Sequence, residues 1–315
     1  MNNKQPLLSI CIPTWNRSKF LTMSLENFQD QLKNVDCSEI ELFISDNCSD
    51  DDTSLVVEKF ISSGLPIKYS RNETNIGADR NFLKCMQWAS GKYIWLLGDD
   101  DILIPETVGY VLDLIRNKDY GIIHFSVSPN KDNLPEVQEY DDRGEFLKAV
   151  SYWITFMSGC VFLKESVALV KNYEKYISTC LLQVPFYVVS SSLCGKNLFV
   201  RKPVMQNGLD ASSNGGYNFY RVFVENYLNI WQEFVDEGLV SPKCYEYIKE
   251  DICINFITKF NWNLLIRRKN LASKGKRGFE ISGAWRILLK HYGKKLYFWK
   301  SFVTFCVKRV WRKVC

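Results

Sequence analysis

The chain of 315 residues lacks the uncharged apolar run of about 18 residues that a membrane-spanning helix needs. Its longest apolar stretches, Ser151–Leu163 and Leu181–Gly195, are too short or too often broken by polar residues. Met1–Pro6 is polar, and Leu7–Ile12 is too brief for the apolar region of a secretory signal. These absences argue against an integral membrane protein and a secreted one, and we expect the protein to act in the cytoplasm.

Histidine is scarce, and the cysteines show no pairing pattern. The two histidines, His124 and His291, argue against a histidine-based metal centre and against histidine-dependent nucleophilic catalysis. The cysteines number 11, which is odd, and none forms a Cys-x-x-Cys pair, so neither a disulfide framework nor a structural zinc site is expected. We expect most of them to be reduced thiols that pack as small apolar side chains.

The charge is small overall but unevenly distributed. Hydrophobic residues make up 46% of the chain and charged residues 24%, which is ordinary for a packed globular protein. The formal net charge is +5, yet residues 267–315 hold 15 Lys or Arg and one acid, Glu280. Residues 1–266 are therefore acidic overall. An acidic body with a basic tail predicts that the tail meets an anionic surface.

The first hundred residues alternate short apolar runs with segments of helical spacing. The predicted strands are Leu7–Ile12, Ile40–Ser45, Ile67–Ser70 and Tyr93–Leu97, and the predicted helices are Lys19–Leu32, Thr53–Ser62 and Asp79–Ala89. This alternation predicts an α/β protein with a parallel sheet that binds ligands at the carboxyl ends of its strands.

The rest of the chain divides into a mixed region and a helical region. We predict a helix at Glu106–Asn117, a strand at Gly121–Ser126, paired strands at Tyr152–Leu163 and a helix at Glu165–Tyr176. From residue 220 the spacing is helical. We therefore expect a sheet-containing catalytic domain over residues 1–219 and a helical C-terminal region over residues 220–315.

The turn Asp99–Asp101 comes directly after the apolar strand Tyr93–Leu97. Several carboxylates on one short turn repel each other, so a cation, alone or with a phosphate, is a natural reason to place them there. Oxygen ligands of this kind suit Mg²⁺ or Mn²⁺. A solvated turn and helix cap is the alternative, and it fits Asp50–Asp52 because Thr53 begins an amphipathic helix. The buried strand before Asp99 favours the functional interpretation there.

Three further polar clusters follow the first, second and third predicted strands. They are residues 11–17, the pair Asp46 and Asn47, and residues 72–81. A turn or capping role would explain each cluster alone. Together with Asp99–Asp101 they lie at successive strand ends, which meet at one rim of a parallel sheet. A nucleotide would bind at such a rim.

The order of these motifs resembles family 2 glycosyltransferases with the GT-A fold. The matching segments are Pro13–Arg17, Ser45–Asp50, Asn75–Asn81 and Leu97–Asp101. The form of the last segment is similar to bacterial enzymes of O-antigen and capsule synthesis, including abequosyltransferase-like members. The resemblance covers about residues 7–125, and beyond them the chain resembles the family only in general layout.

The resemblance implies a Rossmann-like, mostly parallel sheet flanked by helices, with a helical C-terminal region. It also implies transfer of a hexosyl or deoxyhexosyl group from a nucleotide-sugar donor to a hydroxyl group. The residues that would bind the donor by motif match are Pro13, Thr14, Arg17, Asp46, Asn47, Asn75, Gly77, Arg80, Asp99 and Asp100.

Four of these positions carry specific roles in the resemblance. Asp46 would bind the base, and Arg80 would lie near the base or the diphosphate. Asp101 would be the principal ligand of a divalent cation, Mn²⁺ or Mg²⁺, with Asp99 contacting both the ribose and the metal side. A Lewis-acidic cation stabilises the negative charge that the departing nucleoside diphosphate gains.

An inverting enzyme also needs a carboxylate that takes the proton of the acceptor hydroxyl. The resemblance implies an Asp or Glu well after the metal motif, but no Asp occurs between Asp142 and Asp210. The candidates are Glu165, Glu174 and Asp210. The glutamates also fit a solvated helix face, and Asp210 also fits a turn. A retaining reaction needs no such base, so the stereochemistry stays open.

The basic tail has an amphipathic pattern. At about 100° per residue, apolar side chains between Trp285 and Val314 share one face, and most of the cations point away. Such a helix suits an anionic inner leaflet, where each cation contributes about 1 kcal/mol to the free energy of binding. A helix packed on the catalytic domain is the alternative, and Gly293 weakens the case for one continuous helix. We expect residues 284–315 to contact anionic lipids at the inner face of the plasma membrane.

The leading hypothesis is a glycosyltransferase that extends a surface polysaccharide on a lipid-linked oligosaccharide acceptor. A UDP-sugar is the favoured donor, with CDP-sugars and dTDP-sugars as alternatives. A metal-dependent nucleotidyltransferase is a rival, but Pro13–Arg17 lacks the glycine-rich phosphate loop that such enzymes use. A non-catalytic nucleic-acid-binding protein is the other rival. The acidic body argues against a broad phosphate footprint, so no nucleic-acid partner is expected.

Overall fold

The computed structural model describes residues 5–126, 134–206, 216–261 and 278–314. The chain forms two compact units. One comprises Met1–Phe146 with Trp153–Leu209, and the other comprises Leu147–Tyr152 with Asp210–Cys315. Among the described helices, none combines the length and the apolar character that crossing a membrane requires.

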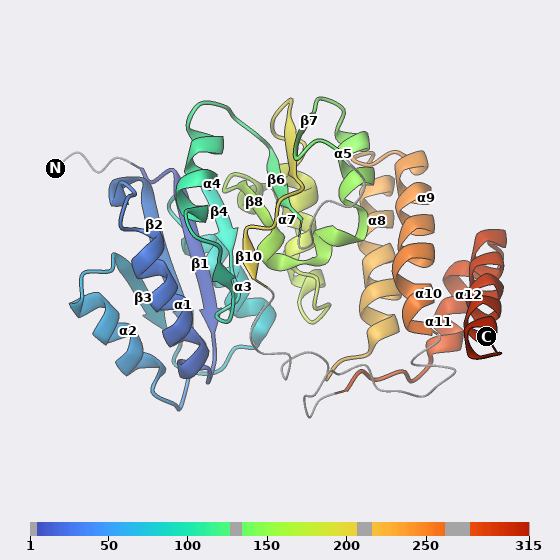
Figure 1. Cartoon of the computed structure of the whole chain (residues 1–315), viewed down its shortest axis with the longest axis horizontal. Helices are drawn as coiled ribbons and strands as arrows, with labels where there is room; N and C mark the ends of the chain where they lie inside the picture. The colour runs from blue at the N-terminus through green and yellow to red at the C-terminus, as the bar shows by residue number, and fades with distance from the viewer. Residues whose placement is uncertain (1–4, 127–133, 207–215, 262–277, 315) are drawn as a thin grey trace. The chain divides into compact units, whose positions relative to one another are not determined.

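The first unit is built on a mixed sheet of eight described strands in the order β3-β2-β1-β4-β8-β6-β9-β7 (Figure 1). The strands are β1 Leu8–Thr14, β2 Ile40–Asp46, β3 Ile67–Arg71, β4 Tyr93–Leu96, β6 Ile122–Phe125, β7 Val137–Tyr140, β8 Cys160–Leu163 and β9 Asn197–Val200. The strands from β3 to β4 are parallel, as are β6 and β9, whereas β8 and β7 are antiparallel to their neighbours. This sheet confirms the predicted α/β fold class.

The described helices of the first unit are α1 Ser18–Gln31, α2 Thr53–Ser62, α3 Ala78–Trp88, α4 Thr107–Arg116, α6 Ser166–Leu169 and α7 Gln183–Ser190. The helix α5 Arg143–Val150 crosses from the first unit into the second. A short antiparallel pair, β5 Ile102–Leu103 and β10 Met205–Gln206, completes the first unit. The second unit contains α8 Tyr227–Asp236, α9 Pro242–Asp251, α10 Thr258–Asn261, α11 Ala284–Tyr292 and α12 Leu296–Val314, with π-helical segments at Arg221–Asn226 and Ile252–Ile257.

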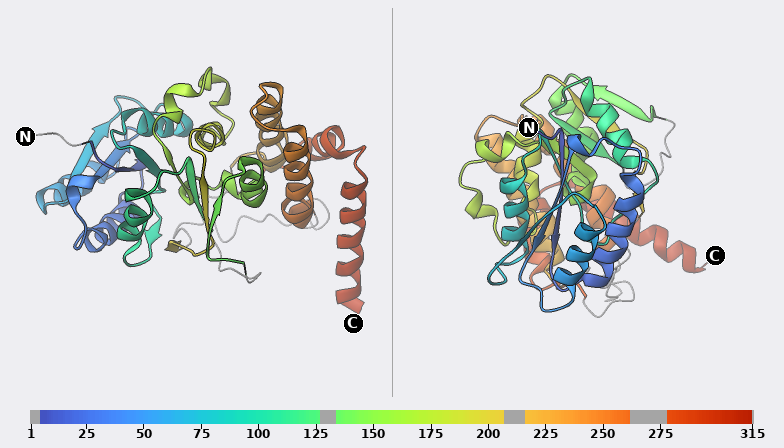
Figure 2. Two further views of the ribbon diagram at one scale, coloured as in Figure 1. Left: turned by 90° about the horizontal axis from the view of Figure 1, so that it is seen from above. Right: turned by 90° about the vertical axis from the view of Figure 1, so that its left-hand side faces the viewer.

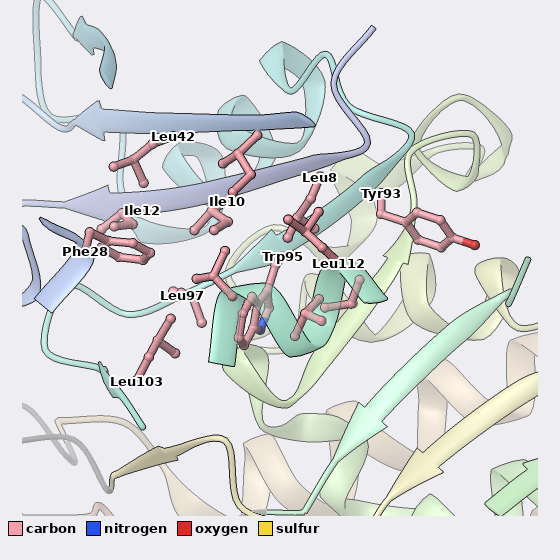
Figure 3. Close-up of a cluster of buried hydrophobic side chains, with 14 of the residues drawn as sticks. Leu8, Ile10, Ile12, Phe28, Leu42, Tyr93, Trp95, Leu97, Leu103 and Leu112 are labelled. Carbon is pink, nitrogen blue, oxygen red and sulfur yellow. The ribbon is translucent and has the colours of Figure 1, made fainter. Parts of the chain in front are cut away.

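The central strands are buried on both faces. Every residue of β1, β2 and β4 is buried, as expected of parallel strands covered by helices. Figure 3 shows Leu8, Ile10 and Ile12 of β1 in one apolar cluster with Phe28 of α1. On the opposite face, the Cys11 thiol lies 3.6 Å from a backbone carbonyl of α3. Because helices cover both faces, polar groups of these strands gather at the strand ends.

Two predicted segments differ from the structure. Tyr152–Leu163 does not form paired strands: it contains 3₁₀ turns at Ser151–Thr155 and Met157–Gly159, followed by β8 alone. The predicted helix Glu165–Tyr176 breaks into α6 and a 3₁₀ turn, because Val170 is extended and Asn172 adopts a left-handed conformation with φ of 52°. The helical spacing of this segment therefore comes from two separate short turns.

The basic tail forms two helices rather than one. Gly293 follows α11, and α12 starts at Leu296. The predicted single apolar face is wrong in detail: Leu288 and Tyr292 are buried within the second unit, whereas Leu289 and Leu296 are exposed. Because α11 ends at Tyr292 and α12 starts at Leu296, the apolar residues of the two helices do not belong to one continuous helical face.

A buried carboxylate stabilises the amino ends of the parallel strands, away from the polar clusters at their carboxyl ends. Glu41 of β2 accepts hydrogen bonds from the Ser9 hydroxyl, the Lys68 ammonium, and the Ser90 amide and hydroxyl. Burial alone would raise the pKa of Glu41, but these hydrogen bonds outweigh it and hold the pKa below its ordinary value. The stabilising contribution of Glu41 is therefore fully present above the pKa that Glu41 has in the unfolded chain. It is lost as the pH falls through that value and then through the lower pKa of Glu41 in the folded chain.

We expect Glu41→Gln to lower the free energy of unfolding at pH 7 by about 2 kcal/mol, because charged hydrogen bonds are weakened and one donor loses its partner. The loss should stay constant from neutrality to about one pH unit above 4.5, the ordinary pKa of a glutamate, and shrink as the pH falls through 4.5 towards the lower pKa of Glu41 in the folded chain. Urea denaturation over this pH range would measure it. The exposed Glu58 of α2 supplies the matched control, Glu58→Gln, which should leave the unfolding free energy nearly unchanged. Equal effects of the two substitutions would contradict the role given to Glu41.

Candidate functional site

The turn after β4 carries three aspartates, and its shape is fixed by one of them. The Gly98 amide donates to Asp101 Oδ2 at 2.7 Å, and the Asp101 amide donates to the Gly98 carbonyl at 3.2 Å. The Ser158 hydroxyl also donates to Asp101 Oδ2. A Cβ atom at Gly98 would lie only 3.0 Å from the Asp100 carboxylate. The turn is therefore a closed, tightly packed loop at the carboxyl end of β4.

Residues at the end of β1 and just after it hold the first two aspartates. Thr14 Oγ1 donates to Asp99 Oδ2 at 2.7 Å, and Arg17 Nε donates to Asp99 Oδ1 at 2.7 Å. Arg17 Nη2 lies 3.0 Å from a carboxylate oxygen of Asp100. The Arg17 guanidinium also lies over the Phe20 ring, 4.7 Å from its centroid. β1 and β4 are parallel neighbours, which brings these distant sequence positions together.

Burial raises the pKa of both flanking aspartates. The pKa of Asp99 rises to about 6 because the carboxylate is desolvated, although Arg17 and the Thr14 hydrogen bond oppose the rise. The pKa of Asp101 also rises to about 6 through burial, against the hydrogen bonds from Ser158 and Gly98. Two carboxylates in such surroundings are anions at neutral pH that a further positive charge would stabilise.

The donor set fits a cation held in large part by its substrate. Both oxygens of Asp99 are occupied by Thr14 and Arg17, whereas Oδ1 of Asp101 has no hydrogen-bond partner among the described residues. Within the described ranges, no three His, Cys, Asp or Glu side chains are grouped so that they could hold a metal. Mg²⁺ and Mn²⁺ are commonly bound by one or two carboxylates together with phosphate oxygens and water. The residues present therefore fit a diphosphate-bound cation at Asp101.

The end of β2 lies directly beside this cluster, because Asp46 is the register partner of Thr14. Asp46 is fully buried and accepts hydrogen bonds from the Tyr69 hydroxyl at 2.7 Å and the Ser49 amide at 2.9 Å. Its carboxylate also lies 3.4 Å from Arg71 Nε. Burial raises the pKa of Tyr69 to about 12, so its hydroxyl stays protonated as a donor to Asp46. Pro13, the residue before Thr14 in β1, is the register partner of Ser45.

The loop after β3 is held against the end of β2 by two amide side chains. Asn47 Oδ1 accepts from Asn72 Nδ2 and from the Ile76 amide, each at 2.9 Å. Asn47 Nδ2 donates to Asn75 Oδ1, which also accepts from the Gly77 amide, again at 2.9 Å. Gly77 has a φ of +84°, a conformation that favours glycine. Asn47, Asn75 and Gly77 thus shape the loop that borders the site.

The two predicted base residues that the structure describes, Glu165 and Glu174, lie in different places. Glu174 forms an exposed ion pair with Arg80 at 2.8 Å, so these two candidates neutralise each other. Glu165 follows β8, which runs antiparallel to β4 and ends beside Tyr93, where β4 begins. Glu165 therefore lies near the amino end of β4, whereas the aspartate turn lies at the carboxyl end of β4. Asp210 lies outside the described residues.

Ser158 is a site residue that the sequence pattern did not indicate. Because β8 is antiparallel to β4, the residues just before β8 lie beside the end of β4. The Ser158 carbonyl accepts from the indole of Trp95 at 2.8 Å, which fixes the backbone while the hydroxyl reaches Asp101. A lone serine before an apolar strand carries no sequence signal. Only the strand direction brings it to the site.

Several known proteins resemble this chain in sequence. The sequence pattern described as Glycosyl transferase family 2 matches residues 9–167. An abequosyltransferase, RfbV, of Salmonella typhimurium is 41% identical over 104 residues, which are 32% of this chain and 30% of that protein. A Campylobacter jejuni GalNAc(5)-diNAcBac-PP-undecaprenol beta-1,3-glucosyltransferase is 32% identical over 120 residues, 38% of this chain and 37% of that protein. The chain thus aligns with about a third of these relatives.

Solved structures share the fold. S. aureus TarS 1–349 in complex with UDP superposes with a TM-score of 0.60 at 17% identity, covering 82% of this chain and 74% of that one. The mannosyltransferase PcManGT from Pyrobaculum calidifontis, in complex with GDP-Man and Mn²⁺, gives 0.56 at 12% identity, covering 98% and 88%. These neighbours confirm the GT-A architecture that the motifs implied. With the matched span from β1 to α6, which includes the aspartate turn, the chain belongs to glycosyl transferase family 2.

Proposed function

We propose that the protein transfers a sugar from a nucleotide-sugar donor to a hydroxyl group of a glycan acceptor in the synthesis of a bacterial surface polysaccharide. The observation that carries the proposal is the joint packing of Thr14, Arg17 and the turn Asp99–Asp101 at the ends of adjacent parallel strands. The names of the relatives, which include an abequosyltransferase and a glucosyltransferase, support this class of reaction.

The donor pocket would follow the strand ends. Asp46, fixed by its buried hydrogen bonds, would receive the base, and Thr14, Asn47, Asn75 and Gly77 would border the nucleotide. Asp99 and Asp100 would lie towards the ribose and the diphosphate. Pro13, Arg17 and Arg80 complete the proposed set, and Arg80 would first have to leave the exposed ion pair with Glu174.

A divalent cation, Mn²⁺ or Mg²⁺, would be held by Asp101, with Asp99 beside it. When bound, it supplies Lewis-acid stabilisation of the charge on the leaving diphosphate. The chain's own groups prepare this position: Ser158 and the Gly98 amide orient the carboxylate of Asp101, and Arg17 adds a fixed positive charge. The PcManGT complex with GDP-Man and Mn²⁺ supports a metal in this fold.

The base of an inverting reaction would take the proton from the acceptor hydroxyl as that oxygen attacks the sugar. We favour Asp210 over Glu165 and Glu174, because β10 ends at Gln206, the register partner of Ile102, which follows Asp101 directly. Asp210 comes only four positions after Gln206 in the sequence, a span of about 14 Å at most along an extended chain. Glu165 and Glu174 are the less favoured alternatives.

The donor and the acceptor are proposed from chemistry and from the relatives together. UDP is the favoured nucleotide, supported by the TarS complexes with UDP and UDP-GlcNAc, and CDP-sugars and dTDP-sugars are the alternatives. A lipid-linked oligosaccharide is the proposed acceptor, because one relative's name contains PP-undecaprenol. Residues 284–315 would bring the enzyme to anionic lipids at the inner face of the plasma membrane.

The first test measures thermal stability with UDP, CDP, GDP and dTDP, each with and without Mn²⁺. One diphosphate should stabilise the protein in the presence of metal, by about 2.7 kcal/mol at a concentration of 100 times its dissociation constant. Asp101→Asn is the control, and it should lose the part of the shift that depends on metal. The corresponding nucleoside triphosphates are measured in parallel, and stabilisation by one of them with no response to any diphosphate would instead favour a nucleotidyltransferase.

A further inference from the structure

The helix α12 has apolar side chains on two opposite sides. At about 100° per residue, four of them fall within an arc of about 80° and form a stripe on its outer side. We call this set the α12 stripe: Leu296, Trp299, Val303 and Val307. Leu296 is 81% exposed and Val303 is 56% exposed. An exposed apolar stripe of this length on one helix is typical of a contact surface.

The inner side of α12 already has its partners within the second unit. Phe298 is buried and stacks on Tyr292 with ring centroids 5.8 Å apart. Phe302 meets the edge of Trp285 at 5.7 Å, and the hydroxyls of Ser301 and Thr258 lie 3.1 Å apart. The α12 stripe is therefore not needed to hold the helix in place. Figure 2 shows α12 extending away from the neighbouring helices along much of its length.

A groove of about 530 Å³ runs beside the same helix. Its walls come from α9, the π-helical segment Ile252–Ile257, α10 and α12. Leu296 belongs to both the groove and the α12 stripe. Ile254, Tyr297 and Phe305 supply much of its apolar wall, with Lys259 and Lys300 as cations and Glu250 as an acid in the lining. The groove extends the apolar surface of the α12 stripe into the unit.

The segment that carries the α12 stripe is strongly basic. Residues 284–315 contain nine Lys or Arg and neither Asp nor Glu. Lys290 and Lys295 are paired with glutamates of the second unit. Arg286, Lys294 and Lys300 are exposed and form no ion pair with any described residue. The surface thus combines exposed apolar side chains with cations that an anionic partner could pair with.

We infer that the α12 stripe is the element that docks on an anionic bilayer, with its apolar side chains at the boundary between headgroups and acyl chains. The inference deepens the proposed inner-face location and rests on that part of the proposed function. A bilayer satisfies both features at once, because lipid phosphates meet the cations while the acyl boundary receives the α12 stripe. A second copy of the chain would instead bring two strongly basic helices together, which like-charge repulsion opposes.

The experiment is sedimentation of the full chain with vesicles of phosphatidylglycerol and phosphatidylcholine, compared with vesicles of phosphatidylcholine alone. We expect binding to the anionic vesicles only. The double variant Leu296→Ser with Val303→Ser should weaken the partition coefficient at least about tenfold. The matched control is Leu55→Ser on α2 of the first unit, where the leucine is 64% exposed, and it should bind as the native chain does.

A second variant tests the charges separately. The triple variant Arg286→Gln, Lys294→Gln and Lys300→Gln should weaken binding about fivefold for each cation removed, and added salt should erase the difference. Unchanged vesicle binding in both the apolar and the charge variants would overturn the inference. Self-association of the native chain that the serine variant abolishes, with no vesicle binding, would assign the face to a second copy and overturn it as well.

The proposed transfer reaction and the docking surface can fail independently. Asp101→Asn should still sediment with anionic vesicles, because the substitution lies in the first unit. The serine variant should still show the metal-dependent stabilisation by a nucleoside diphosphate. Loss of nucleotide response with intact vesicle binding would therefore count against the proposed function, and the reverse result would count against the α12 stripe.

Discussion

Asp101→Asn should lower the rate of sugar transfer by about a thousandfold or more while leaving the folded structure intact. The amide is close in shape to the carboxylate, and its oxygen can still accept from the Gly98 amide and the Ser158 hydroxyl. What it loses is the negative charge that would hold a divalent cation at Oδ1. Because burial already raises the pKa of Asp101 to about 6, removing this charge should cost little folding stability.

Two comparisons make this result specific. Asp101→Ala leaves the Gly98 amide and the Ser158 hydroxyl without their acceptor, so it should also lower the unfolding free energy by about 1–3 kcal/mol. Asp100→Asn changes the same charge at a more exposed position one residue away, and it should reduce transfer far less. Transfer assays and thermal denaturation of the three variants would separate these effects. Native activity in Asp101→Asn would refute the metal role of Asp101.

The sequence made the parallel half of the sheet predictable because its strands are buried on both faces. β1, β2 and β4 appear as continuous apolar runs, and polar residues follow each run where the strand ends. Once the strands are parallel, their ends must meet at one edge, so the grouping of Thr14, Asp46 and Asp99 follows from the pattern. Local signals were sufficient here because strand direction was implied by the intervening helices.

The antiparallel strand was not predictable in the same way. β8 is as apolar as β4, and nothing in its four residues states that it runs in the opposite direction. Because of this direction, Ser158 lies beside Asp101 and Glu165 lies at the opposite end of the neighbouring strand β4. The tail had a related difficulty, since periodicity identifies an apolar face but not whether protein or solvent lies against it. Leu288 and Leu289 are neighbours in the pattern, yet one is buried and the other exposed.

Arg17→Met should lower the unfolding free energy by about 3 kcal/mol at neutral pH and weaken binding of the nucleoside diphosphate about a hundredfold or more. Asp99 is buried, and the Arg17 guanidinium is the main positive charge that opposes its desolvation. Without Arg17 the pKa of Asp99 should rise further. Asp99 in the folded state would then keep its proton at a pH where the unfolded chain has lost it, so the stability of the variant should fall as the pH rises.

A double-substitution cycle separates the charge of Arg17 from its packing. Adding Asp99→Asn to Arg17→Met removes the unpaired buried carboxylate, so most of the lost stability should return and its pH dependence should flatten. Diphosphate binding should stay weak, because the cation that faces Asp100 is still missing. Lys19→Met makes the same charge change at an exposed site two residues away and should alter neither property. Urea denaturation between pH 5 and pH 8, with calorimetric titration of UDP in the presence of Mn²⁺, would measure both. If the double variant were as unstable as Arg17→Met, the stabilisation would come from the contact of Arg17 with the Phe20 ring, and the aspartate turn would not depend on Arg17 for its charge balance.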